Sequence, residues 1–233
     1  MLDLTYTVSI HINLMSTTTK KNKPAKLTRK KILRSAVAMA NRDGIESLSM
    51  RKLAGTLGVE AMSLYNHVTN KDDVLDGMVE LVALEIELPP IDKDWKKAIR
   101  KRTISTHQVL LKYPWASALF VSRINIGPAM LHYVDTTIGY LQAAGFSYKK
   151  ADYCWNMIDS FLHGFTLQEL NFPFEPSEYK DVAKDFSPQL PKDQYPHLYA
   201  LSAEVISGRH DGQQDFNFGL DLILDSIEKL PKK

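Results

Sequence analysis

Cysteine is almost absent from this sequence, and long apolar runs are absent altogether. The single cysteine among 233 residues, Cys154, excludes an internal disulfide and a cysteine-rich metal module, and it suits a reducing compartment. No 18 consecutive residues are apolar, so the sequence predicts no membrane-spanning helix. Because 44% of the residues are hydrophobic and 24% are charged, we expect a soluble protein with an ordinary core, and the single cysteine fits a cytoplasmic location.

The motifs of common catalytic centres are missing as well. The sequence contains no HExxH, no GxSxG, no phosphate-binding GxxxxGK[ST] and no GxGxxG after a strand. Among the seven histidines, His107, His132 and His163 fall on separate predicted helices without the spacing of metal ligands. We therefore predict no metal site, no cofactor and no enzymatic activity.

The net charge of +2 hides an uneven distribution along the chain. Residues 20–71 hold twelve basic and three acidic side chains, a net charge of +9, whereas residues 72–233 hold seventeen basic and twenty-three acidic ones, a net charge of −6. Asp3 supplies the remaining −1. A small basic module beside an acidic body is expected where one end of a protein meets a polyanion.

The first residues form a separate stretch. Apolar and polar side chains alternate from Leu4 to Ile12 with the period of a strand, but a single strand without a partner is only marginally stable. The stretch lacks the pattern of a secretory signal. We expect residues 1–14 to be an extension upstream of the functional start, with Met15 as the first native residue, and residues 16–26 to be a basic arm.

The chain is organised around residues 49–71. Gly58 lies in a tight turn between two short segments of helical periodicity, and Ser49 and Asn70 are suited to cap the helices that follow them. Two helices joined by a short turn with a glycine are typical of a DNA-binding helix-turn-helix.

Its neighbours predict a small helical domain. A first helix is expected at about residues 28–41, ended by Gly44, and it would cover the helix that starts after Ser49. A third helix is expected at about residues 61–68, with Leu64 pointing inward.

The run from Thr28 to Leu75 resembles the N-terminal domain of the tetracycline-repressor (TetR) family of bacterial transcriptional regulators. The resemblance rests on GVEAMSLYNHVTNKDDVLD and above all on its LYxHVxNK pattern, and the closing FNFGLDLILDSIEKL looks like the family's C-terminal helix. It implies an all-α homodimer with a three-helix helix-turn-helix domain and a larger helical domain for ligand binding and dimerisation. We expect an extension and arm over 1–26, the DNA-binding domain over 27–72 and the second domain over 73–233.

The resemblance also assigns residues that face DNA. Short polar side chains near the start of a groove-inserted helix can reach base edges, and Tyr65 and His67 can reach phosphate or sugar. Ala61, Met62 and Asn66 differ from the tetracycline repressor, which carries glutamine, proline and tryptophan there, so the operator sequence stays open. The positions carried over are Arg51, Ala61, Met62, Ser63, Tyr65, Asn66, His67 and Lys71.

The remaining sequence predicts a body of helices. A helix from Asn70 carries a broad apolar stripe up to the prolines at 89 and 90, and it would pack against both domains. A long proline-containing loop with about one helical turn is expected at residues 171–192. Further helices are expected at residues 94–112, 115–122, 128–144, 147–170 and 196–207, with a last one from Phe216.

Two of these helices carry apolar faces suited to a dimer. The last helix has a heptad seam from Phe216 to Leu230, and the helix at 147–170 has two apolar stripes that need two partners. We expect a four-helix interface between two subunits, with packing inside one chain as the alternative. The expected interface residues are Trp155, Leu162, Phe216, Leu220, Ile223 and Ile227.

An apolar pocket with a few polar groups is expected within residues 94–170. On alignment, the tetracycline repressor's metal-binding histidine, metal-coordinating glutamate and other drug-contacting histidine fall near Phe120, Phe172 and Glu87, so we expect no binding of magnesium–tetracycline. Ordinary core packing is the alternative for each pocket candidate. The candidates are His107, Trp115, Phe120, Arg123, Tyr133, Met157, Phe161, His163 and Phe165.

These observations predict a homodimeric, nucleoid-associated regulator whose partner is double-stranded DNA with a palindromic operator. By analogy with the family, we expect a repressor that an unidentified small-molecule effector releases from DNA. A ligand-independent DNA-binding protein and an enzyme in the helical body are the alternatives.

Overall fold

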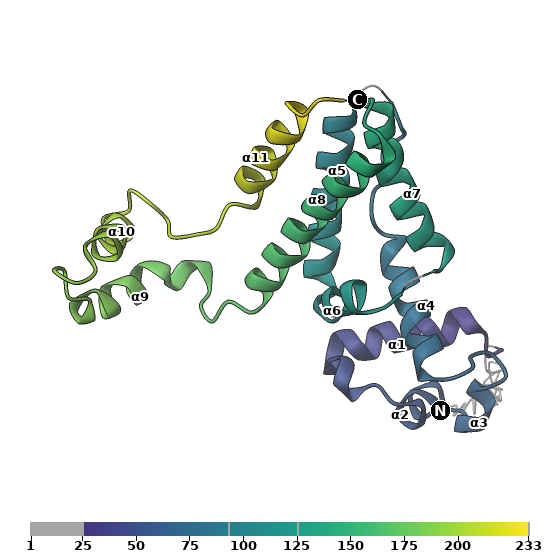
Figure 1. The fold of residues 1–233 in the computed structure, drawn as a ribbon. Helices are drawn as coiled ribbons and strands as arrows, with labels where there is room; N and C mark the ends of the chain where they lie inside the picture. Colours follow the sequence, from purple (N-terminus) through teal and green to yellow (C-terminus); the bar gives the residue numbers. More distant parts are fainter. Residues whose placement is uncertain (1–25, 93, 125, 233) are drawn as a thin grey trace, which may run out of the picture.

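The computed structural model describes residues 26–92, 94–124 and 126–232, and within these ranges it contains helices and no strand. Figure 1 shows a small head of helices at one end, a larger helical body, and an arm that extends from the body. The predicted all-α fold is confirmed. The predictions for residues 1–14, for Met15 and for most of the basic arm lie outside the described residues. No helix in the described ranges is long and apolar enough to cross a lipid bilayer.

The head begins with α1 (Arg29–Asp43). Thr28 caps this helix, because its Oγ1 accepts the Lys31 backbone N–H at 3.2 Å. Apolar residues recur at helical spacing on its inner face, where Ile32 is fully buried. Gly44 ends the helix at a φ of +79°, a value that glycine adopts without steric cost.

A tight turn at Gly58 joins α2 (Met50–Leu57) to α3 (Ala61–Leu64). Gly58 is left-handed, with φ at +67° and ψ at 35°. The α3 helix is shorter than the predicted span to residue 68, because the next residues form tighter turns and Val68 enters the core with 3% of its surface exposed. The predicted helix-turn-helix is present with a shorter second helix.

The connecting helix is α4 (Lys71–Ala83). Its cap is Asn70, whose side-chain oxygen accepts the Asp73 backbone N–H at 2.8 Å. The helix ends at Ala83, before the prolines at 89 and 90 to which it was predicted to extend. Ile86, beyond its end, is still buried in the same core. One side of α4 packs on α1, and other positions pack on α6 (Pro114–Ser122) and α7 (Pro128–Ala143). The predicted packing of this helix against both domains is confirmed.

The body is built around α5 (Trp95–Lys112) and α8 (Tyr148–Leu170), which pack along each other (Figure 1). Asp94 caps α5 and Ser147 caps α8 through their side-chain oxygens. A proline occupies the first position of both α6 and α7, where its missing N–H costs nothing. The bounds of these four helices agree with the predictions to within one residue.

The arm contains α9 (Tyr179–Phe186) and α10 (Pro196–Ser207), which pack against each other. The bounds of α10 confirm the prediction, but the predicted loop is wrong for residues 179–186, which form two helical turns. All four prolines of the segment lie outside α9, so none of them interrupts it. Neither arm helix has a buried residue, and Figure 1 shows both extending away from the body.

The last helix, α11 (Phe216–Glu228), packs on α5 and α8 of its own chain. The expected dimer interface is therefore wrong for four residues, which are between 0% and 7% exposed within a single chain: Leu162, Phe216, Leu220 and Ile227. A side chain already covered by its own chain has no apolar area left for a partner. Trp155 and Ile223 are half-buried, so their place in an interface stays a prediction.

Candidate DNA-binding interface and effector site

The residues predicted to meet DNA lie on the surface of the helix-turn-helix. Met62 is 75% exposed and Tyr65 is 45% exposed, whereas Leu64 between them is fully buried and anchors α3. Five of the eight predicted positions are exposed, namely Arg51, Met62, Tyr65, Asn66 and Lys71. The other three are half-buried, namely Ala61, Ser63 and His67. All eight are therefore accessible to a nucleic acid.

The head is also positively charged. Its described residues, 26–71, hold nine basic and three acidic side chains, a net charge of +6. A small surface of this sign attracts the phosphate backbone of DNA.

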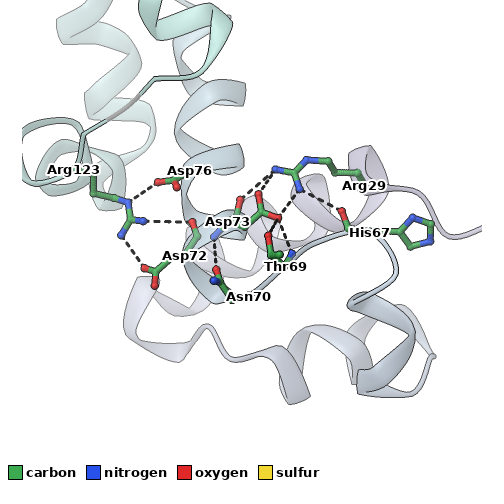
Figure 2. Close-up of polar contacts among 8 residues, drawn as sticks. All are labelled: Arg29, His67, Thr69, Asn70, Asp72, Asp73, Asp76 and Arg123. Atoms are coloured by element: carbon green, nitrogen blue, oxygen red, sulfur yellow. Dashed lines mark hydrogen bonds and ion pairs between the residues drawn. The ribbon is translucent and has the colours of Figure 1, made fainter.

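An ion pair between α1 and α4 fixes the segment that follows α3. Arg29 donates to the two carboxylate oxygens of Asp73 at 2.8 and 2.5 Å and to the His67 carbonyl at 3.3 Å (Figure 2). Asp73 also accepts the Thr69 backbone N–H at 2.8 Å and the Thr69 hydroxyl at 2.9 Å. The Arg29 guanidinium and these donors hold the pKa of Asp73 far below its usual range. The ionised carboxylate therefore sets the position of the loop that carries His67.

Arg123, just after α6, joins the body to the first turns of α4. Its Nε donates to Asp76 at 2.7 Å and its Nη1 donates to Asp72 at 3.1 Å (Figure 2). The bond to Asp76, together with that to Asp72, raises the pKa of the Arg123 guanidinium. These bonds join the end of α6 to the first turns of α4, which also pack against each other.

Glu80, farther along α4, holds the start of α7. Its carboxylate accepts the backbone N–H groups of Ala129 at 2.7 Å and Met130 at 3.1 Å. A carboxylate at a helix N-terminus is favoured by unpaired N–H groups and by the helix dipole. Gly127 precedes α7, and a side chain there would overlap the Glu80 carboxylate. The α4 helix is thus tied to the head at one end and to the body along its length.

Inside the body, α5, α7 and α8 meet around a buried guanidinium. Arg102 of α5 is 0% exposed, and its Nη1 donates to Asp159 of α8 at 2.8 Å. Its Cζ lies 4.1 Å from the ring centroid of Tyr133 of α7. The other Asp159 oxygen accepts the Trp155 indole N–H at 2.8 Å. Burial alone would lower the pKa of Arg102, but the Asp159 carboxylate outweighs it and keeps the guanidinium charged.

Both parts of the chain match one family of known proteins. Residues 32–78 match the bacterial regulatory proteins of the tetR family, and residues 88–230 match the tetracyclin repressor-like C-terminal domain. The chain belongs to the TetR family. It is a transcriptional regulator with a DNA-binding helix-turn-helix and a ligand-binding C-terminal domain, and it is not an enzyme.

Individual relatives agree with this assignment. The tetracycline repressor protein class D of Escherichia coli is 28% identical over 211 residues, which are 88% of this chain and 90% of that protein. An HTH-type transcriptional regulator of Saccharopolyspora erythraea is 43% identical over 121 residues, so the match spans 52% of this chain and about half, 51%, of that protein. The solved structure of ActR from Streptomyces coelicolor in complex with actinorhodin has a TM-score of 0.73 at 24% identity, over 87% of this chain and 97% of that one, and it shows the shared fold.

The TetR-family body brings three of the nine predicted pocket residues together near Arg102. Tyr133 lies against the guanidinium, and the rings of Phe120 and His163 are 6.4 Å apart. Burial lowers the pKa of His163, on which the charges of Asp159 and Arg102 act in opposite directions. These side chains come from α6, α7 and α8, so they surround an interior site.

Three other candidates gather at a cleft on the side of the arm. Phe216 stacks on the His107 ring at 4.0 Å between centroids, and it contacts Phe161 at 5.3 Å and Phe165 at 5.2 Å. The cleft has a volume of about 900 Å³, and His107 and Phe165 line it together with the segment before α11. Burial lowers the pKa of His107, although the Glu169 carboxylate at 3.2 Å opposes the shift. The cleft is a second place that could admit a small molecule.

The last three candidates make other contacts or are exposed, and their role in a pocket stays a prediction. Met157 is 59% exposed on the outer face of α8. Trp115 instead donates its indole N–H to Asn41 of α1 at 2.5 Å, and Arg123 binds α4. No three or more His, Cys, Asp or Glu side chains in the described part of the chain are arranged to hold a metal ion.

The central residues of the interior site, Arg102 and Asp159, were not predicted from the sequence. Arg102 follows the buried Ile99 by three positions and precedes the buried Thr106 by four, which places it on the inward stripe of α5. An arginine on the inward stripe of a helix is a signal that could have been found. Its partner Asp159 is 57 positions away, and no local pattern pairs the two residues.

Proposed function

We propose that this chain is a homodimeric repressor that binds a palindromic operator and is released when a small molecule enters its body. The observation that supports this proposal best is the set of bonds along α4. Its first turn is bonded to the head through Asp73, and Asp72 and Asp76 bind Arg123 beside α6. A ligand that displaces α6 would therefore move α4 and reorient the head. Residues 27–72 would act as the DNA-binding domain and residues 73–233 as the ligand-binding and dimerisation domain, in the cytoplasm.

In the proposed complex, α3 enters the major groove. Ala61, Met62 and Ser63 at its start face base edges, where the exposed Met62 can contact a thymine methyl group. Arg51 and Lys71 contact phosphates on either side of the groove.

Tyr65, Asn66 and His67 follow α3 and complete the proposed contact surface. Their hydroxyl, amide and imidazole groups can reach phosphate, sugar or base edges from the loop. The bond from Arg29 to the His67 carbonyl supports this assignment, because it holds the loop in place before DNA binds.

The proposed dimer uses the outer faces of α8 and α11. Large apolar side chains are exposed there, namely Tyr153 at 61% and Met157 at 59% on α8, and Phe218 at 65% and Leu222 at 53% on α11. Exposed apolar area of this kind on neighbouring helices marks a protein–protein contact. Trp155 and Ile223, which are half-buried, would lie at the edge of the same surface.

The proposed effector is a small molecule held within the body. The structurally similar ActR is bound to actinorhodin in its solved structure, which supports ligand control in this fold. The charge of Arg102 acts on His163, whose ring lies 6.4 Å from that of Phe120 on α6, whereas the cleft at His107 is lined by residues between α8 and α11. The interior site is therefore better placed to act on Arg123 and α4.

Selection of bound duplexes from a random-sequence library, followed by footprinting, tests the proposal. We expect an inverted repeat with half-sites about 10 bp apart, because two heads related by a two-fold axis read two successive major grooves. Phosphate contacts by Arg51 and Lys71 in each subunit make four per dimer. The logarithm of the binding constant then falls with the logarithm of salt at a slope of about −3.6, or about 150-fold between 50 and 200 mM.

Variants of the phosphate contacts provide the matched control. Lys71→Ala removes one contact from each subunit and should reduce that slope by about 1.8 without changing the selected sequence. One asymmetric half-site together with a flat response to salt would contradict the dimer and the proposed contacts.

A further inference from the structure

The cleft at His107 lies where the arm joins the body. Its volume of about 900 Å³ is within the range of small-molecule sites. Its lining residues come from α5, from the end of α8, from the start of the arm and from the segment that leads into α11. The arm leaves the body at the end of α8 and returns at α11 (Figure 1). A ligand in this cleft would therefore contact the body and both ends of the arm.

Aromatic rings form much of the lining. The rings of Phe172 and Phe174 meet at 70°, and Phe172 stacks on Tyr179 with 5.2 Å between centroids. Phe172 is nevertheless 39% exposed. Phe165 and Phe216 line the cleft from α8 and α11. The face of an aromatic ring carries partial negative charge, so rings of this kind attract both flat apolar groups and cations.

The charged side chains of the cleft are acidic. Glu169, Glu175, Asp211 and Asp215 line it, and the lining residues that the structure describes include no lysine or arginine. Burial raises the pKa of Tyr179, and the charge of Glu169 raises it further, so this carboxylate of α8 acts on the arm. In the described part of the chain these acids are not grouped as metal ligands. Their charge therefore favours an organic cation.

His107 and Glu169 provide a directional contact. The Thr166 hydroxyl donates to the Leu162 carbonyl at 2.6 Å, so its oxygen accepts from the His107 Nδ1–H at 2.9 Å. Burial lowers the pKa of His107, although Glu169 opposes the shift, and the neutral ring then presents Nε2 as an acceptor. Nε2 lies 3.2 Å from a carboxylate oxygen of Glu169. Two adjacent acceptors without a proton between them suit a ligand that donates to both.

We propose that this cleft binds a protonated amine that carries an aromatic ring. The ammonium donates to the Glu169 carboxylate and to the His107 Nε2, and the aromatic ring lies among Phe165, Phe172 and Tyr179. An anion would be repelled by the acidic lining. The inference goes beyond the proposed function, because the described lining residues belong to α5, α8, the arm and α11 rather than to α4 and α6, through which the proposed effector acts.

Naphthalene compounds of similar shape test the class of ligand. The purified full-length protein is titrated by isothermal calorimetry with 2-(2-naphthyl)ethylamine, which is protonated at neutral pH, with 2-(2-naphthyl)ethanol and with 2-naphthylacetate. We expect the amine to bind at least about tenfold more tightly than the alcohol, because it forms hydrogen bonds to a charged group. The anion should not bind. The trimethylammonium derivative keeps the charge but has no N–H, so it should lose most of the preference.

Glu169→Gln keeps the size of the side chain but removes its charge. Glu169 is 44% exposed, so we expect the variant to fold and to lose the preference for the amine over the alcohol. Asp152→Asn is the matched control, since Asp152 lies on the same helix and bonds to Asn156 instead. It should leave both affinities unchanged. Circular dichroism verifies that both variants are folded.

A second pair of variants locates the ring of the ligand. Phe172→Leu keeps an apolar side chain but removes the aromatic face, and it should weaken binding of the amine by about threefold or more. Phe186→Leu is the control, because Phe186 is also an exposed ring of the arm, at 53%, and does not line the cleft. It should bind the amine as the wild type does.

Several results would overturn the inference. Equal binding of the amine and the alcohol would mean an apolar cleft without selection for charge, and tighter binding of 2-naphthylacetate would mean an anion site. Equal binding of the amine and its trimethylammonium derivative would contradict the contact with His107 and Glu169. Equal losses in Glu169→Gln and Asp152→Asn would place the amine elsewhere. These titrations contain no DNA, so their failure and the failure of operator selection are separate results.

Discussion

Replacement of Asp73 by asparagine tests how the head is held to α4. The change keeps the size of the side chain but removes the charge from a carboxylate that accepts four hydrogen bonds, two from Arg29 and two from Thr69. A hydrogen bond to a charged group contributes about 1.5–3 kcal/mol. The Asp73 and Arg29 side chains are 23% and 43% exposed, so water screens the pair and the low end of that range applies. We expect Asp73→Asn to lower the free energy of unfolding by about 1.5–2 kcal/mol.

Urea denaturation followed by circular dichroism measures this loss. Asp43→Asn is the matched control, because Asp43 also binds an arginine in the head, its exposed neighbour Arg42, and should leave stability unchanged within error. In a double-mutant cycle, Arg29→Met and Asp73→Asn should couple by about 1 kcal/mol or more. A loss below about 0.5 kcal/mol for Asp73→Asn would refute the view that this carboxylate fixes the head.

The same variant has a defined pH dependence. The folded pKa of Asp73 is depressed, so its stabilisation is fully present above the unfolded pKa of about 4 and is lost as the pH falls below that value. The difference in stability between wild type and Asp73→Asn should therefore shrink below about pH 4 and stay constant from about pH 5 to 8. A difference that grows on acidification would contradict this assignment.

Three further changes probe the junction between α4 and α6, the turn at Gly58 and the proposed dimer interface. Arg123→Gln removes partly exposed ion pairs and should cost less than about 1 kcal/mol in urea denaturation, while it weakens the preference for the complete inverted repeat over an isolated half-site in a polarisation assay. Gly58→Ala places a side chain at a φ of +67° with open space around it, so strain alone should cost about 1–2 kcal/mol; a neutral result would contradict a left-handed turn. Leu222→Glu should yield a folded monomer in light scattering, whereas Leu220→Ala should cost about 2–5 kcal/mol because it empties a site inside one chain.

Helix bounds could be predicted from the sequence wherever short-range chemistry sets them. Thr28, Ser49, Asn70 and Ser147 each accept a backbone N–H three residues on, and that bond depends on the local sequence alone. Gly58 was predictable for the same reason, since few other residues adopt its φ. The surface positions of α3 then followed from helical periodicity.

Contacts between distant parts of the chain were less predictable. The seam of α11 was recognised as apolar, but periodicity identifies an apolar face and not its partner, and Leu220 proved to pack within its own chain. The interior site depends on Arg102 and Asp159 meeting across two helices, which no spacing in the sequence shows. The α9 helix was missed because prolines close to both of its ends resembled a continuous loop.

The hydrogen bonds that join α4 to the head and to the body affect how the protein would recognise its operator. About 10 Å of helix separates Asp73, which binds the head, from Glu80, which binds the start of α7. A tilt of α4 about Glu80 would change the distance between the two heads of a dimer without altering the surface of either head. An effector would then act on spacing alone, so the released protein should keep its salt-dependent affinity for an isolated half-site and lose only its preference for the complete inverted repeat.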